Sequence, residues 1–154
     1  MTPVSTRGSF PDAEAVTLRR LAPLVGGLSH VGNSTPADLQ SRLPFHRVTR
    51  VGGADDRLTD FPAVDVDTYA ATRSEARRAA EQARDLLTSG PWRDVVTDDA
   101  GRRVVSVIDG VDTDTGPFIP PASSQGGESA TDSTARGVVR FTASYTLRAR
   151  RTSA

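Results

Sequence analysis

One stretch near the end of the chain limits the possible folds more than any other. From Gly137 to Arg150 apolar and polar residues alternate, which is the period of a half-buried β-strand. The apolar set is Val139, Phe141, Ala143, Tyr145, Leu147 and Ala149, and the polar set is Arg140, Thr142, Ser144, Thr146, Arg148 and Arg150. At roughly 3.3 Å per residue the strand spans about 40 Å, twice the usual length. We therefore expect helices on its apolar face, and water, acidic groups or another subunit on its arginine-bearing face.

The size and composition fit one lean domain. The chain has 154 residues, of which 36% are hydrophobic. Cysteine is absent, which excludes disulfides, thiolate zinc sites and a cysteine nucleophile. The best apolar run, Leu18 to Val31, is interrupted by two arginines, a proline and two glycines, so we expect no membrane span.

The charges cancel overall but are unevenly spread. A formal net charge of zero argues against a general nucleic-acid binder. Residues 54–67 hold five aspartates and one arginine, whereas residues 136–154 hold five arginines and no acid. All 19 basic residues are arginine, whose planar fork suits interfaces and carboxylate pairing. A GC-rich coding bias is the simpler explanation of that composition.

The remaining segments predict an α+β fold. We expect one helix from a cap at Ser9 to Val25 and a second from a cap at Thr72 or Ser74 to Thr88. Further strands are predicted at residues 28–33, 43–51, 61–67 and 103–109, the last able to continue to 115, with an acidic surface loop at 54–60 and a turn at 98–101. The prediction is a two-layer domain over residues 11–151. It has a mixed or antiparallel sheet of four to five strands and two main helices on one face. Residues 1–10 form a flexible arm, and residues 117–136 form a mobile loop at the tip of a long hairpin.

No catalytic, cofactor or metal site is proposed by the residues. His30 and His46 stand apart from acids and from each other. Asp55, Asp56 and Asp60 are typical of a solvated turn, and residues 109–116 lack the spacing and the closing glutamate of an EF-hand. We therefore expect a protein that is not an enzyme and that has no cofactor.

The order of segments resembles the tail terminator (tail-completion) proteins of long-tailed bacteriophages, particularly those infecting actinobacteria. The resemblance covers most of residues 11–150 and rests chiefly on a strand ending in Gly52-Gly53, an acidic loop, the run Asp60-Phe-Pro-Ala-Val-Asp-Val-Asp67 and the alanine-rich helix 74–87. It implies a structural virion protein that forms a hexameric ring at the head-proximal end of the tail. Such a ring caps the tail tube, ends its polymerisation and offers a head-joining surface. The implied partners are further copies of the chain, the tail tube protein and a head-completion or neck protein. DNA would pass through the lumen without sequence-specific binding, and assembly would take place in the host cytoplasm.

A ring built from identical head-to-tail contacts needs two different complementary surfaces on each subunit. We expect the acidic 54–67 region and the basic 136–151 strand to provide them, with Asp65, Asp67, Arg140, Arg148 and Arg150 at the interface. The nearest alternative is a stopper protein of the neck. A small nucleic-acid-binding module using the arginine face is a third hypothesis, and an enzyme using His30 or His46 is the last.

Overall fold

The long alternating segment is a central strand of the sheet. The computed structural model describes residues 10–98, 100–121 and 137–151. In it β6 (Val139–Arg150) pairs antiparallel with β3 (Thr59–Ala70) on one side and with β5 (Arg103–Phe118) on the other. The sheet order is β1-β2-β3-β6-β5-β4, where β1 is Val31–Gly32, β2 is Phe45–Asp55 and β4 is Trp92–Thr97. Only the short β1–β2 pairing is parallel.

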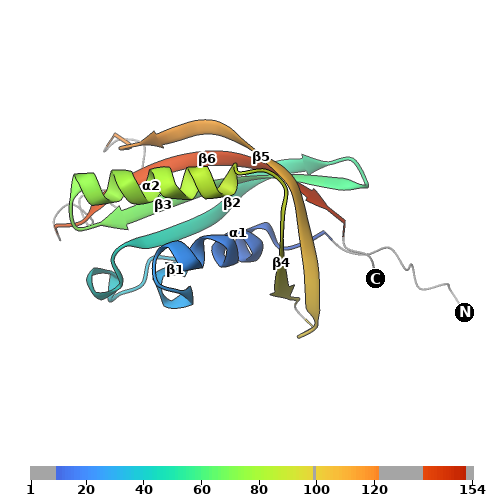
Figure 1. Ribbon diagram of the computed structural model, residues 1–154, viewed down its shortest axis with the longest axis horizontal. Helices are drawn as coiled ribbons and strands as arrows, with labels where there is room; N and C mark the ends of the chain where they lie inside the picture. The colour runs from blue at the N-terminus through green and yellow to red at the C-terminus, as the bar shows by residue number, and fades with distance from the viewer. Residues whose placement is uncertain (1–9, 99, 122–136, 152–154) are drawn as a thin grey trace, which may run out of the picture.

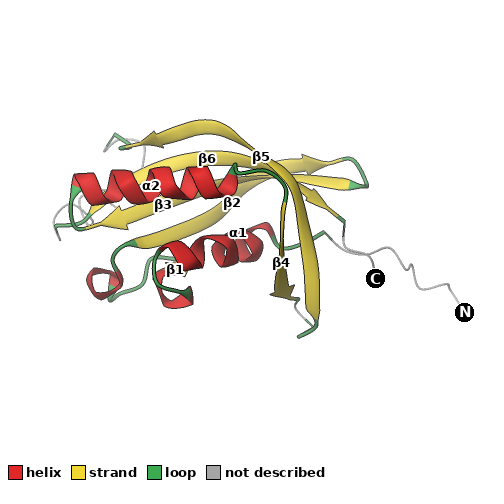
Figure 2. Cartoon of the chain, in the orientation of Figure 1, coloured by secondary structure: helices red, strands yellow, loops and turns green. Residues whose placement is uncertain are grey.

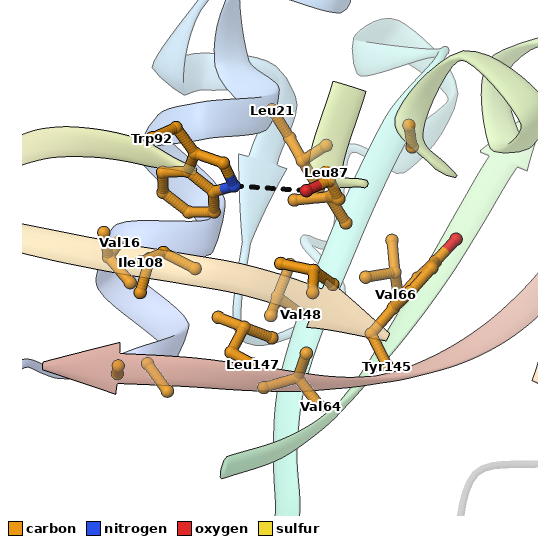
Figure 3. Packing of buried hydrophobic residues seen from close by; sticks show 14 of the residues in the cluster. Val16, Leu21, Val48, Val64, Val66, Leu87, Trp92, Ile108, Tyr145 and Leu147 are labelled. Carbon is orange, nitrogen blue, oxygen red and sulfur yellow. Dashed lines mark hydrogen bonds between the residues drawn. The ribbon is translucent and has the colours of Figure 1, made fainter. Parts of the chain in front are cut away.

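The predicted alternation of β6 is confirmed by its burial. The inward residues from Phe141 to Ala149 are buried, whereas the outward ones are half-buried or exposed. Figure 3 shows this apolar side meeting valines of β2 and β3 and side chains of both helices. Burial raises the pKa of Tyr145 to about 12, so its hydroxyl is neutral at ordinary pH. The described core includes Val16, Leu21, Val48, Val64, Val66, Leu87, Ile108, Tyr145 and Leu147.

Both helices begin at side-chain caps. The first, α1 (Ala13–Leu21), is capped by Asp12, whose carboxylate accepts the N–H groups of Glu14 and Ala15. Asp12 therefore takes the role predicted for Ser9, which lies outside the described residues. The second, α2 (Arg73–Leu87), is capped by Thr72, one of the two predicted caps, in a reciprocal capping box with Glu75. The buried alanines of α2 let it approach the sheet closely.

The sheet curls around the helices, which corrects the prediction of a plain two-layer domain. The helix α2 lies over β3, β5 and β6 (Figure 1). The helix α1 contacts both β2 and β4, although these strands lie near opposite edges of the sheet. Figure 2 shows β5 bending away from β6, carrying β4 beside α1. At Gly110, opposite Arg148, the absence of a side chain leaves room for the Arg148 guanidinium, which a Cβ would displace. The curl encloses α1 between the two margins of the sheet.

The sheet has six strands rather than four or five. The prediction missed β4, which forms a hairpin with β5. The pairing runs from Trp92 opposite Ile108 to Thr97 opposite Arg103. The turn predicted at 98–101 joins the two strands. It placed a longer strand at 28–33, where a 3-10 helix at 28–30 leaves only Val31 and Gly32 for β1. Two more 3-10 helices lie at residues 22–24 and 39–42.

Two predicted loops are shorter than expected, because the strands run further. The acidic loop at 54–60 is a tight hairpin tip, since β2 continues to Asp55 and β3 begins at Thr59. The hairpin loop predicted at 117–136 begins later, because Pro117 and Phe118 still belong to β5. Residues 122–136 lie outside the described residues, as do residues 1–9 of the predicted N-terminal arm.

The sheet face opposite α1 and α2, hereafter the outer face, carries a small apolar cluster at one end. Phe45 and Tyr69 are cross-strand partners there, with ring centroids 6.5 Å apart. Leu39 and Val138 complete the cluster. Beyond this cluster, the outward side chains of β6 are all polar, from Arg140 to Arg150.

Candidate assembly surface

All five predicted interface residues lie on the outer face. Asp65 and Asp67 project from β3, and Arg140, Arg148 and Arg150 project from β6. The two strands are direct neighbours, with Asp65 opposite Ser144 and Asp67 opposite Thr142. The acidic and basic segments therefore form one surface of one subunit rather than two separate surfaces.

The carboxylates of β3 are held by partners within the subunit. The Arg47 guanidinium donates to Asp67 Oδ2 at 2.7 and 3.1 Å, and the Thr142 hydroxyl donates to Asp67 Oδ1 at 2.5 Å. The Ser144 hydroxyl donates to Asp65 at 2.6 Å. Short hydrogen bonds to an ionised acceptor are among the stronger ones in proteins. These bonds tie β6 to β3 across the outer face.

A third hydroxyl and two arginines continue this pattern toward β5. The Thr146 hydroxyl donates to Asp114 at 2.6 Å. Arg150 donates to both carboxylate oxygens of Asp109 at 2.5 and 3.1 Å, and this contact raises the pKa of the Arg150 guanidinium. Arg148 lies against the Gly110 backbone, 3.8 Å from Asp112.

Arg140 differs from the other two arginines. Its Nε is buried without a hydrogen-bond partner among the described residues.

The outer face carries charges of both signs, because carboxylates lie beside Arg148 and Arg150. It is therefore not a continuous positively charged surface. Such a face does not favour the nucleic-acid hypothesis. The assembly role of the five predicted residues stays a prediction.

The other candidate residues have structural surroundings. His30 Nδ1 lies 2.7 Å from the Arg42 carbonyl oxygen, and His46 is fully buried beside Thr68. Asp60 is buried in an ion pair with Arg50, with two contacts of 3.0 Å. Residues 109–116, which lack the ligand spacing of an EF-hand, are part of strand β5. Over the ranges the structure describes, no three His, Asp or Glu side chains gather as a metal site would require.

Two surface features were not identified from the sequence as contact sites. The first is the end of the β2–β3 hairpin, where Val51 and Leu58 are exposed. The second is the group of exposed arginines Arg73, Arg77 and Arg78 on α2. The signal for the first feature was a pair of apolar residues, Val51 before the acidic loop and Leu58 within it.

Comparison with known protein families decides the classification. A family model described as phage tail termination protein matches residues 9–118, from the start of the described chain to the last residue of β5. The chain belongs to the phage tail termination family. The resemblance stated from the sequence is thereby confirmed.

Members of this family are structural components of phage tails. The match spans both helices and five of the six strands, whereas β6 lies beyond it. The search of curated proteins returned no match. None of the helices in the described part of this family member is long and apolar enough to cross a membrane.

Proposed function

We propose that this protein is the tail terminator of a long-tailed phage. In this role it forms a homo-oligomeric, hexameric ring at the head-proximal end of the tail tube. The ring ends tube polymerisation and presents the surface that joins the neck or head-completion protein. The observation that carries the proposal is the family match over residues 9–118, which includes the whole helix-bearing part of the fold.

The proposed partners are the neighbouring copies, the tail tube protein and the neck protein, with DNA passing through the lumen without sequence-specific contact. The mixed charge of the outer face supports the last point, because carboxylates beside Arg148 and Arg150 limit adhesion to phosphates. The proposed location is the virion, after assembly in the host cytoplasm. The stopper hypothesis shares all these properties except the tube contact.

The deciding experiment places the purified protein with purified tail tubes. We expect light scattering to give the mass of a ring and electron microscopy to show density on one end of each tube. Protein that leaves both tube ends bare while binding the neck would favour the stopper hypothesis.

The outer face is proposed as part of the assembly surface. The variant Arg148→Glu/Arg150→Glu should prevent ring formation, since it places two more acids beside Asp109 and Asp112. Circular dichroism checks that the variant folds, and Arg93→Glu/Arg103→Glu, on exposed parts of β4 and β5, is the matched control. A normal ring from the Arg148→Glu/Arg150→Glu variant would exclude this surface.

A further inference from the structure

The end of the β2–β3 hairpin, residues 51–59, is an ordered arm that exposes two apolar side chains. Leu58 and Val51 are 75% and 56% exposed. The Asp56 carboxylate accepts the N–H groups of Leu58 and Thr59, and the Arg151 N–H donates to the Leu58 carbonyl. Figure 1 shows the arm projecting past α1 and α2. An ordered segment that exposes apolar side chains loses little conformational entropy on binding.

The same arm carries acidic groups without cationic partners. Among the described residues, Asp55 and Asp56 are exposed and accept hydrogen bonds only from backbone N–H groups of the turn. Two cations share this region. The Arg151 side chain is engaged with the Arg57 carbonyl and the Phe10 ring, and the Arg57 side chain is exposed at the tip.

The opposite end of the molecule carries exposed arginines and further exposed apolar side chains. Arg73, Arg77 and Arg78 are exposed on the first turns of α2, and none of them forms an ion pair with a described carboxylate. Phe118 and Ile119, at the end of β5, are 39% and 42% exposed. The register puts these groups at one end, because Phe118 lies opposite Thr142 and α2 begins just after β3 ends at Ala70.

The arm and the α2 end lie too far apart to contact each other within one subunit. The strand β3 connects them, running from Thr59 beside the arm to Ala70 beside α2. Its 12 residues span about 36 Å when extended. A contact between the ends therefore requires a second copy of the chain.

We propose that the arm of one subunit binds the α2 end of the next. Leu58 and Val51 would pack near Phe118 and Ile119, and Asp55 and Asp56 would face the three α2 arginines. This contact is heterologous, because different surfaces meet, and repeating it closes a ring when the rotation allows. The inference rests on the proposed ring and names the contact that builds it.

Two variants each remove one side of this contact. The arm variant is Asp55→Arg/Leu58→Ser, which keeps Asp56 and its turn hydrogen bonds. The helix variant is Arg73→Glu/Arg77→Glu, in which glutamate in the first turns also suits the helix dipole. The matched controls are Val105→Ser, at a side chain that is 52% exposed on β5, and Arg93→Glu/Arg103→Glu.

We expect each contact variant alone to remain monomeric by sedimentation velocity and to leave tube ends uncapped, whereas the controls assemble normally. An equimolar mixture of the two variants should give heterodimers, because one intact arm meets one intact α2 end. The other two surfaces both have reversed charge, and they lack the Leu58 side chain, so we expect them to associate more weakly and the heterodimer to be the main species.

Ring formation by either variant alone, or a mixture that stays monomeric at concentrations where the wild type assembles, would overturn the arm contact. In both cases capping by the wild type would leave the tail-terminator function standing. Failure of the wild type itself to cap tubes would instead remove the proposed function, and the arm contact with it.

Discussion

At the scale of single residues, His46 has the most unusual surroundings. It projects from β2 into the helix-covered side of the sheet, shares a 2.9 Å hydrogen bond with Thr68 and is fully buried. Its Nε2 is buried without a hydrogen-bond partner among the described residues. Desolvation lowers the pKa of His46 from its ordinary value of 6.5 to about 4, because charging the ring there is costly.

This burial predicts a loss of stability in mild acid. Since the folded pKa is the lower one, the unfolded chain binds the proton first, and stability falls as the pH drops from 6.5 toward 4. Between about pH 7 and about pH 5 we expect the free energy of unfolding to fall by about 2 kcal/mol. Urea denaturation at several pH values measures the slope, with His30→Gln as the control. A His46→Gln variant should show a flatter profile, and equal slopes would assign the effect to other groups.

The sequence identified the two histidines but not their environments. Both read as isolated residues, and only the pairing of β2 with β3 shows that His46 meets Thr68 inside the fold. The same holds for Asp65 and Asp67. Their outward direction follows from the alternation of β3, whereas their partners come from β2 and β6, far away in sequence.

Asp67 permits a second test at this scale. Its side chain is 9% exposed, and Arg47 is its cationic partner. An Arg47→Met variant leaves a buried carboxylate with only the Thr142 hydroxyl, which should destabilise the fold by about 3 kcal/mol. Arg102→Met breaks an ion pair whose arginine is 77% exposed and should leave the unfolding midpoint nearly unchanged. Equal effects of the two changes in urea denaturation would contradict this account.

At the scale of elements, local patterns predicted β6 and α2 well because each has a strong period and clear boundaries. The 12 residues of β6 alternate without interruption, and α2 has its capping box before a buried alanine stripe. The pattern failed at β4, where charged residues interrupt a short apolar run and pairing with β5 decides the structure. It also failed to show the curl, which depends on how β5 bends and not on any one strand.

The cap of α2 gives a prediction that separates the two candidate residues. Thr72→Ala removes the side chain that accepts the Glu75 N–H and should destabilise the protein by about 1 kcal/mol. Ser74→Ala, two residues later and exposed, should have little effect. Thermal unfolding followed by circular dichroism compares them. A larger loss from Ser74→Ala would place the cap elsewhere.

At the scale of the whole molecule, the chain separates its unpaired charges along its length. Within the described residues, most ion pairs join neighbouring strands or residues within one helical turn or loop. The carboxylates of the arm and the arginines of α2 instead lie at opposite ends of the subunit. A net charge of zero therefore includes carboxylates and arginines that lie far apart and form no ion pair with each other among the described residues. Head-to-tail assembly is the arrangement in which such a subunit satisfies both ends.

This polarity predicts that salt weakens assembly. Raising the ionic strength from about 0.05 M to about 0.5 M shortens the screening length and should increase the dissociation constant of the subunits several-fold. Sedimentation at the two salt concentrations measures it. The arm variant Asp55→Arg/Leu58→Ser, already monomeric, should show no salt dependence. Assembly that strengthens with salt would indicate that apolar contacts dominate.

The position of Trp92 has a practical consequence. It is the single tryptophan of the chain, buried among α1, α2 and β4, and its Nε1 donates to the Leu87 carbonyl at 3.1 Å (Figure 3). Arg20 lies over its ring at 5.1 Å. Its fluorescence therefore reports whether a subunit is folded, and it belongs neither to the arm nor to the first turns of α2. The protein thus carries an intrinsic optical label that separates unfolding from dissociation of the proposed ring without any added dye.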